Sequence, residues 1–519
     1  MYYEIRVGKQ EGFSLQQAVD LINAPDQIEN LPAEQKQWAI PVVGNRHTLV
    51  LERDANISLG RDMLVVRSSV HIRGNNTVMT GTAAYAMLIM ASDVTVEDLT
   101  MDSFPAAIMV DPFGMAIHDV KIIGCRFRNY IGSCILTGSS ISKGSLQQLT
   151  IENCAFEGSP EMTVKGMDDW HGAPISIMLS AGRNSGEATL EHCLLEDVRI
   201  QNCKFCGRTR IGIDTIPAVM GEAKTNAKAI GNVIRGLSID NCTFEGSYDA
   251  TINIMGSFAG NVDSLTENIT ITNCNLLYNI WGIYFCATEP CDGTAENVIV
   301  RNIEVAHNTL TLREGGSGED SAALAIQCGR LDYAEGAKAN YGIVENVVLK
   351  DNTIHHTQHG IFLNAADSMV DAMNAEMIGN EIRHVRIEGN RLYEVDDCFT
   401  FYGVQAEGRR VDVRLGIPPR TMIWLPLLTE HDVTTITAKD NVIWDVLCRD
   451  NYATGHKFMY KIAGVKAAGH AYVEGNRVAE DVILENNTFE NGENHILVEE
   501  MVLCDWVQGK NNTVPKRYR

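Results

Sequence analysis

A short pattern of apolar and polar positions recurs along most of the chain. It has the form apolar-x-x-(Cys or Asn)-x-apolar, and its copies start 29 to 51 residues apart, too irregularly for leucine-rich or ankyrin repeats. One intermediate copy, VRNIEV (300–305), has Ile303 at the fourth position. The other copies are IIGCRF (122–127), IENCAF (151–156), IQNCKF (200–205), IDNCTF (239–244), ITNCNL (271–276), LKDNTI (349–354), IEGNRL (387–392), AKDNVI (438–443) and LENNTF (484–489).

A second short strand is predicted after most of these copies. The segments are IGIDTI (211–216), ATINIM (250–255), WGIYFC (281–286), ALAIQC (323–328), HGIFLN (359–364) and CFTFYG (398–403). Alternation with a period of two points Ile213, Ile252, Ile283, Ile326, Ile361 and Phe399 inward. One outward row is then Asp214, Asn253, Tyr284, Ala325, Phe362 and Thr400, and the next is Ile216, Met255, Cys286, Gln327, Asn364 and Tyr402.

Repeated short strands of this kind predict an all-β chain, a single right-handed parallel β-helix with loops inserted between coils. Parallel strands stack about 4.8 Å apart, so the fourth position of the motif should form a ladder of Cys and Asn along the solenoid. We expect these cysteines to be inert, buried thiols. The helical periodicity of FSLQQAVDLIN (13–23) predicts a capping helix over one open end. We therefore divide the chain into an N-terminal cap (1–55), a parallel β-helix (56–510) and a C-terminal tail (511–519).

The ladder, the coil pattern and the inserted loops resemble the pectin-lyase-like β-helix superfamily over about residues 60 to 510. That superfamily consists mostly of polysaccharide lyases, polysaccharide hydrolases, epimerases and phage tailspikes. The resemblance implies a carbohydrate substrate bound along one strand face. It does not choose among these chemistries, because one fold hosts many functions.

The net charge of the chain narrows the class of molecule that it can bind. The net charge of −23 argues against nucleic acid and anionic membranes, which need clustered Lys and Arg. It also favours a neutral oligosaccharide or polysaccharide over a polyanionic one. The N-terminal segment has no apolar core of signal-peptide length and no stretch reaches the roughly 20 apolar residues of a membrane span, so we expect a cytoplasmic protein with free thiols.

One candidate catalytic cluster centres on the adjacent carboxylates Asp396 and Asp397. One coil earlier, HGIFLNAAD (359–367) offers Asp367 as a third carboxylate. Paired carboxylates perform glycoside hydrolysis, one as proton donor and the other as base or nucleophile, so stacking of these three would build an active site. The expected substrate-binding residues around them are His359, Asn364, Tyr402 and Gln327. The alternative is that Asp396 and Asp397 only cap a turn.

This first cluster also resembles one enzyme family. VDDCFTFYG (395–403) is similar to the paired-aspartate motif of the polygalacturonases, and Asn364 to Asp367 loosely resembles that family's Asn-Thr-Asp segment. The Gly-His-Gly and Arg-x-Lys segments of polygalacturonases are absent from the sequence. The resemblance therefore implies paired-carboxylate hydrolysis without implying galacturonate as the sugar.

A second candidate cluster centres on Asp214, which projects from the middle of a strand. Asn253 and Tyr284 follow on successive rungs. Arg210, Asp249, Trp281 and Glu289 lie at the strand ends, where an aromatic ring could stack on a sugar. The alternative is a solvated strand face. Asp214 and Thr400 are five rungs apart in the outward row, roughly 24 Å, so the two clusters cannot share one catalytic centre.

Three functions follow from these patterns. The first is a glycoside hydrolase, or a related transglycosylase such as a fructotransferase, working without a cofactor or a metal. The second is a polysaccharide lyase or epimerase acting on a uronate, whose charge calcium held by acidic loops would neutralise. The third is a non-catalytic glycan-binding β-helix. Solenoids of this kind sometimes form homotrimers side by side, which would place a site at a subunit interface.

Overall fold

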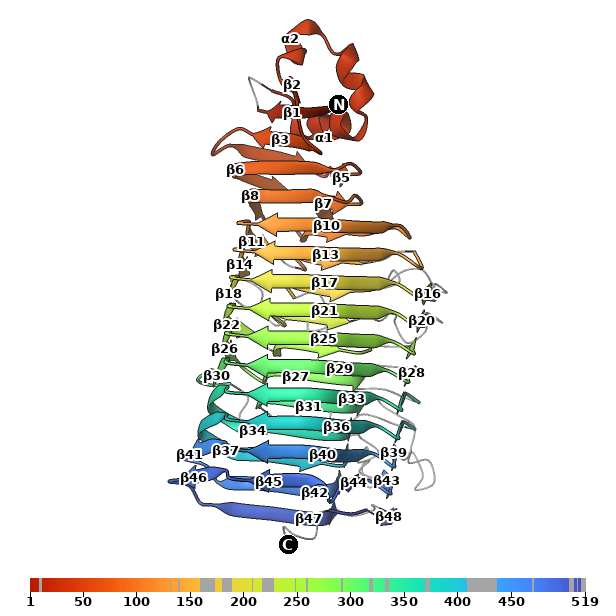
Figure 1. Ribbon diagram of the computed structural model, residues 1–519, viewed down its shortest axis with the longest axis vertical. Coiled ribbons are helices and arrows are strands. Elements are labelled where there is room, and N and C mark those ends of the chain that lie inside the picture. The colour runs from red at the N-terminus through yellow and green to blue at the C-terminus, as the bar shows by residue number, and fades with distance from the viewer. Residues whose placement is uncertain are drawn as a thin grey trace, which may run out of the picture.

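Parallel pairing between successive coils runs along almost the whole chain. The computed structural model describes residues 1–8, 12–130, 132–138, 141–158, 173–179, 189–207, 209–216, 228–247, 249–257, 260–290, 293–316, 321–331, 336–368, 374–407, 436–468, 471–503, 508–510 and 512–514. Within them, one sheet of 39 strands winds around the solenoid, and a second sheet of nine strands lines one edge of it (Figure 1). The chain is a right-handed parallel β-helix, which confirms the predicted fold.

Each central coil contributes four strands. In one coil these are β24 (Asn261–Val262), β25 (Leu265–Thr272), β26 (Asn275–Tyr278) and β27 (Trp281–Thr288). Each pairs in parallel with its counterpart in the next coil, β28 (Thr294–Glu296), β29 (Ile299–Ala306), β30 (Thr309–Leu312) and β31 (Ala322–Leu331). The same four positions therefore recur as four columns of strands along the solenoid.

The other strands fall into these columns. The β25 column contains β8 (Val94–Asp102), β10 (Ala116–Ile123), β13 (Ser145–Glu152), β17 (Leu194–Gln201), β21 (Val233–Asp240), β33 (Ile343–Lys350), β36 (Glu381–Glu388), β40 (Val442–Arg449), β44 (Arg477–Val478) and β45 (Val482–Glu485). The β26 column contains β11 (Arg126–Tyr130), β14 (Ala155–Gly158), β18 (Lys204–Cys206), β22 (Thr243–Ser247), β41 (Tyr452–Thr454), β46 (Thr488–Glu490) and the first halves of β34 (Thr353–Ser368) and β37 (Arg391–Tyr402). The nine-stranded sheet adds β16 (Thr189–Glu191), β20 (Lys228–Ile230), β32 (Lys338–Asn340), β35 (Glu376–Ile378), β39 (Ile436–Lys439), β43 (Ala471–Glu474) and β48 (Gln508–Lys510).

The fourth column carries the predicted site. It contains β7 (Tyr85–Ile89), β9 (Ala106–Val110), β12 (Ile135–Thr137), β15 (Ile175–Met178), β19 (Ile213–Ile216), β23 (Ala250–Met255), β27, β31, the second halves of β34 and β37, β38 (Gln405–Glu407), β42 (Phe458–Ala468) and β47 (His495–Leu503). Inward side chains of this column pack in the main core, and its outward side chains form what we call the site face.

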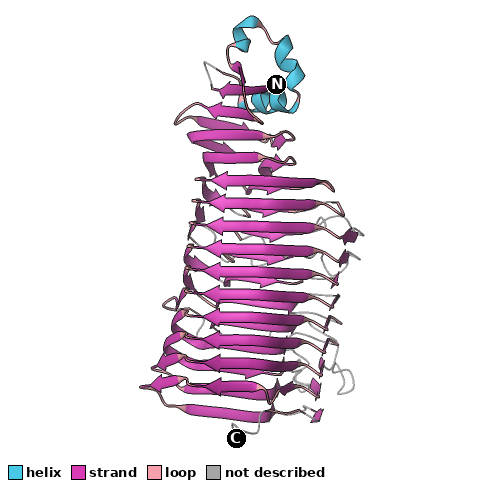
Figure 2. Ribbon diagram, in the orientation of Figure 1, coloured by secondary structure: helices cyan, strands magenta, loops and turns pink. Residues whose placement is uncertain are grey.

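A short helix covers the N-terminal end of the core, as the sequence predicts (Figure 2). Helix α1 (Leu15–Asn23) starts at Ser14, whose side chain and that of Gln17 form a capping box. It buries Leu15, Ala18, Val19, Leu21 and Ile22. A 3₁₀ turn (Pro25–Asn30), α2 (Ala33–Lys36), β2 (Ala39–Val42), β4 (Asn56–Gly60), β5 (Leu64–Val66) and β6 (Val70–Gly81) complete this end.

The large sheet begins before residue 56. Strand β1 (Tyr2–Val7) pairs in parallel with β3 (His47–Leu51), and β3 pairs in parallel with β6. Residue 55 is therefore no break in the sheet, and the division into cap, β-helix and tail stays a prediction. Among the described residues, no helix is long and apolar enough to cross a membrane.

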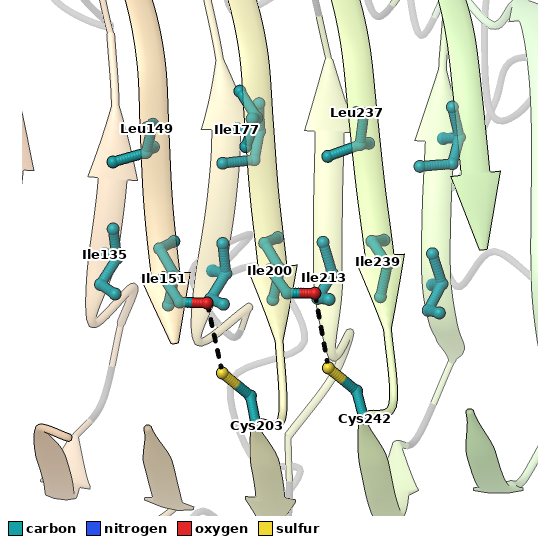
Figure 3. Packing of buried hydrophobic residues seen from close by; sticks show 14 of the residues in the cluster. Ile135, Leu149, Ile151, Ile177, Ile200, Cys203, Ile213, Leu237, Ile239 and Cys242 are labelled. Atoms are coloured by element: carbon teal, nitrogen blue, oxygen red, sulfur yellow. Dashed lines mark hydrogen bonds between the residues drawn. The ribbon is translucent and has the colours of Figure 1, made fainter. Parts of the chain in front are cut away.

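The Cys and Asn ladder is present and holds neighbouring coils together. Cys203 Sγ contacts the carbonyl oxygen of Ile151 at 3.7 Å, and Cys242 Sγ contacts that of Ile200 at 3.8 Å (Figure 3). Further along, Asn308 Nδ2 donates to the carbonyl oxygen of Ile271 at 2.9 Å. The thiol and the amide thus occupy the same place and donate to the preceding coil in the same way.

Two predicted ladder positions were wrong. The residue that follows Cys274 in the ladder is Asn308, not Ile303, because Ile303 pairs with Ile269 and Val347 in the core. Asn441 belongs to a second ladder at another corner of the coil. That ladder links Asn380, Asn441, Asn476 and Asn512, whereas the first continues through Asn352, Asn390, Asn451 and Asn487.

Backbone conformation explains the residue before each ladder position. It has a positive φ, which Gly, Asn and Asp adopt more readily than most residues. The residues are Gly124, Asn153, Asn202, Asn241, Asn273, His307, Asp351, Gly389, Asp450 and Asn486. Cys203 and Cys206 have the spacing of a CxxC motif, yet both are free thiols, Cys203 in the buried ladder and Cys206 half-buried outside it.

Candidate active site

The two predicted outward rows of the site face stack as expected. Asp214, Asn253, Tyr284, Ala325, Phe362 and Thr400 are paired on successive strands, and Met255, Cys286, Gln327, Asn364 and Tyr402 are paired beside them. One inward position differs, since Leu324 rather than Ile326 aligns with Ile283. Ile326 still points into the core, two residues along.

The site face continues beyond these two rows. A third row at the strand starts contains Ala250, Trp281, Ala322, His359, Asp397 and Phe458. The Asp214 row extends from Thr400 to Lys461. Most side chains of the face are apolar and buried, and several form a cluster separate from the main core. Its polar side chains are therefore held in apolar surroundings.

Asp214 is a buried carboxyl group with a strongly perturbed pKa. Its side chain lies on β19 with the residue only 5% exposed, and Asn253 Nδ2 donates to Asp214 Oδ1 at 2.8 Å. Burial raises the pKa of Asp214 to about 7, while the Asn253 hydrogen bond and the charge of Arg210 oppose the rise. Asp214 can therefore exchange a proton near neutral pH.

A second carboxylate and an aromatic ring accompany Asp214. Asp249 forms an ion pair with Arg210 at 3.5 Å, and its charge contributes to raising the pKa of Asp214. The backbone nitrogen of Trp281 donates to the carbonyl oxygen of Asp249, and the indole ring is only partly buried. The sequence predicts Asp249 at a strand end of this cluster, without assigning it a catalytic role.

Tyr284 joins residues that the sequence assigned to different clusters. Its hydroxyl lies 2.8 Å from Gln327 Oε1 and 3.1 Å from Glu289 Oε2, and Gln327 Nε2 donates to Asp367 Oδ2 at 2.9 Å. Arg330 donates to the Tyr284 hydroxyl at 3.2 Å and lies over the rings of Tyr284 and Trp281. The structure thus brings Tyr284, Gln327 and Asp367 into one polar network, next to Asp214 and Asn253.

A compact ion cluster surrounds Asp397. Lys461 Nζ lies 2.7 Å from Asp397 Oδ2, His359 Nδ1 lies 3.1 Å from it, and Gln358 Nε2 lies 3.3 Å from it. Asp397 is 1% exposed. Burial alone would raise the pKa of Asp397, but the bonds from His359 and Lys461 outweigh it and hold that pKa below its ordinary value. Asp397 is therefore an ionised anchor that fixes an imidazole and an ammonium group.

The predicted grouping of Asp367, Asp396 and Asp397 is wrong. Asp396 pairs with Lys457 at 2.8 Å in a partly exposed position, whereas Asp397 is buried and bonded to His359 and Lys461. Asp367 pairs across the sheet with Arg330 and Gln405, whereas Asp397 pairs with His359, eight residues before Asp367 on β34. Eight extended residues span roughly 26 Å, so these three carboxyl groups do not form one centre.

The two remaining predicted residues, Asn364 and Tyr402, also lie on the site face. Neither belongs to the Tyr284 network or to the Asp397 cluster. Asn364 is completely buried between Gln327 and Tyr402 in its row. Tyr402 packs edge-on against Phe362, with ring centroids 5.8 Å apart.

Lys461 was missed because the segment FMYKIAG (458–464) was not recognised as a further copy of the second strand. Among the described residues, no group of three or more His, Cys, Asp or Glu side chains could hold a metal ion.

Comparisons with known proteins are limited to distant structural likenesses. No protein family model matches the chain, and no curated protein sequence matches it. Among solved structures, the chain is similar to PfbA, a surface adhesin of Streptococcus pneumoniae, with 11% identity over 74% of this chain and 89% of that chain and a TM-score of 0.35.

Two further solved structures act on or bind glycans. A mutant tailspike protein of the E. coli bacteriophage HK620, in complex with a pentasaccharide, is 11% identical over 92% of this chain and 74% of that chain, with a TM-score of 0.32. The A-module of the mannuronan C-5 epimerase AlgE6 of Azotobacter vinelandii is 12% identical over 94% of both chains, with a TM-score of 0.24. At TM-scores of 0.35 and below, these likenesses leave the function of this chain open.

Proposed function

We propose that this chain binds an oligosaccharide or polysaccharide along the site face and hydrolyses one glycosidic bond, with Asp214 as the proton donor. The observation that carries the proposal is the buried Asp214 carboxyl group, whose pKa of about 7 keeps a proton available near neutrality, beside the Asp249–Arg210 pair. Two carboxyl groups in different environments are what glycoside hydrolysis needs.

The proposed reaction assigns one task to each group. Asp214 gives its proton to the glycosidic oxygen as the bond to the anomeric carbon breaks. Asp249 takes a proton from a water molecule whose oxygen bonds to that carbon, or it bonds to the carbon itself before water releases the sugar. Trp281, partly exposed beside Asp249, offers a ring on which a sugar can stack. The reaction requires no cofactor, and transfer to a second sugar replaces hydrolysis where a hydroxyl takes the place of water.

The test measures new reducing ends released from a panel of neutral oligosaccharides. Asp214→Asn and Asp249→Asn should each lower turnover by about 100-fold or more, because each removes an acid–base group. Asp396→Asn is the matched control, since Asp396 pairs with Lys457 and lies on a coil five strand pairings away from Asp214. Near-normal turnover in both site variants would contradict the proposed roles.

A second candidate function rests on the ion cluster around Asp397. His359, oriented by Asp397, is placed as a base, and Lys461 is a cation that could face a sugar carboxylate. This arrangement favours a lyase or epimerase acting on a uronate, and Lys461 is a basic side chain that the sequence did not indicate on this face. Ultraviolet absorbance of an unsaturated product, with and without a chelator, distinguishes this chemistry from hydrolysis. Loss of that product in His359→Gln but not in Asp214→Asn would favour the second candidate.

A further inference from the structure

Asn364 stands out among the buried polar groups of the site face. Its side chain is fully buried, and neither its amide oxygen nor its amide nitrogen has a hydrogen-bond partner. A buried amide without partners is costly, because it gives up its bonds to water and gains none. Such a group is rare in a folded chain and needs a reason.

Other buried asparagines show that this fold can satisfy an amide well. Asn352 Nδ2 donates to the carbonyl oxygen of Val305 at 2.8 Å, and its Oδ1 accepts from Asn308 at 3.0 Å. Asn380 and Asn441 are bonded in the same manner in the second ladder. Among the buried asparagines that the structure describes, Asn364 is the one with both amide atoms unbonded.

The neighbours of Asn364 do not complete its bonding. Gln327, the preceding residue of the row, has its oxygen engaged by Tyr284 and its nitrogen by Asp367. Phe362, two residues earlier on β34, is apolar and packs against Tyr402. Asn253, on the same face, is in a related position, since its nitrogen donates to Asp214 while its buried oxygen has no partner.

We infer that Asn364 is a specificity-determining residue that recognises a pair of hydroxyl groups on a neutral sugar bound along the site face. One sugar hydroxyl donates to the amide oxygen, and the other accepts from the amide nitrogen. This inference rests on the proposed function in one respect only, that the ligand of the face is a glycan. Since Asn364 is closed to solvent, the sugar has to displace side chains that enclose it.

The experiment compares stability and binding in the same variants. Asn364→Leu, with Asn364→Ala as a smaller alternative, is measured by thermal unfolding and by calorimetry with neutral tetrasaccharides of glucose, galactose, mannose and xylose. We expect an unchanged or slightly higher melting temperature together with about tenfold weaker binding, the loss of roughly two hydrogen bonds. The matched control, Asn352→Leu, should lower the melting temperature, because it removes an amide whose bonds are made.

The outcomes separate this inference from the proposed hydrolysis. Binding of a tetrasaccharide without any turnover would contradict the hydrolase and leave the role of Asn364 standing. A lower melting temperature in both Asn364 variants would overturn the inference, because the amide would then be structural. Unchanged binding at an unchanged or higher melting temperature would also overturn it, as would a failure of all four sugars to bind the unsubstituted chain.

Discussion

Asn253 Nδ2 donates to Asp214 Oδ1 across 2.8 Å, and the two residues hold the same position in successive coils. An amide nitrogen can donate to a carboxyl oxygen in either protonation state. The bond therefore orients Asp214 without forcing it to be ionised, and burial decides the proton balance. Several measurable consequences depend on this kind of stacked contact.

The first prediction concerns stability as a function of pH. The pKa of Asp214 is about 7 in the folded chain against an ordinary value of 3.8, so the unfolded chain loses this proton first as pH rises. The contribution of Asp214 to the free energy of unfolding should thus be greatest below about pH 4 and decline up to about pH 7. Urea unfolding across this range should show a smaller decline in Asp214→Asn. An identical pH dependence in both proteins would contradict the raised pKa.

A second prediction compares two neighbouring Asp–Lys pairs. Lys461→Met should lower the free energy of unfolding by about 3 kcal/mol, because it removes one partner of Asp397, which is 1% exposed. Lys457→Met should change it by less than about 1 kcal/mol, because the Lys457 side chain is 55% exposed. Urea unfolding near neutral pH measures both, and equal effects would argue against burial as the cause.

The same pair has its own pH dependence. The pKa of Asp397 is lowered in the folded chain, so its stabilising contribution is present above the ordinary carboxyl pKa and is lost as pH falls through the folded value. Lys461→Met should therefore differ most from the unsubstituted chain near neutrality and least in strong acid. A difference that grows in acid would contradict this assignment.

The third prediction concerns the ladder. Asn308→Cys should lower the free energy of unfolding by about 1–3 kcal/mol, because Asn308 Oδ1 accepts from the backbone nitrogen of Cys274 and a thiol cannot replace that acceptor. The reciprocal variant, Cys274→Asn, should be neutral or stabilising. Chemical denaturation of the two variants checks both signs, and a neutral Asn308→Cys would show that the acceptor is dispensable.

A fourth prediction concerns alternating charges on the β25 column. Glu267 lies between Arg235 and Arg301 on adjacent strands, 2.6 Å and 2.7 Å from their nitrogens, with its side chain only 7% exposed. Glu267→Gln should lower the free energy of unfolding by about 1–2 kcal/mol, because no negative charge would then lie between the two positively charged arginines. The effect should be smaller in high salt, which screens these charges. The exposed pair of Lys204 and Glu245 provides the control, and Glu245→Gln should have little effect.

The sequence predicts the rows of the site face well and the catalytic grouping poorly. Alternation with a period of two is a property of the strand itself, so it places Asp214 with Asn253 and Gln327 with Asn364 correctly. The grouping of Asp396 with Asp397 failed because alternation does not predict which partners a carboxylate meets: Asp396 pairs with Lys457, and Asp397 with His359 and Lys461. The sequence places Asp249 at a strand end without a role and does not indicate Lys461 at all, because both depend on how far each strand extends and which side chains meet at its ends.

The sequence predicts that Cys and Asn form a ladder, but not that there are two ladders. Cys and Asn at one corner of the coil follow from the motif, yet the Asn441 motif looks the same as its neighbours and belongs to another corner. Local sequence does not encode which corner a turn occupies. That assignment depends on the lengths of the strands and loops around it.

Stacking in register fixes distances along the solenoid in whole strand spacings. Asp214 and Thr400 are separated by whole strand spacings of about 4.8 Å, and each residue keeps contacts mainly with its own and adjacent coils. Removing or inserting one complete coil between them would move the Asp214 carboxyl and the Asp397 cluster closer or further apart by one such step. The reach between two chemical groups along a bound glycan is thereby adjustable in fixed increments, independently of the chemistry at either end.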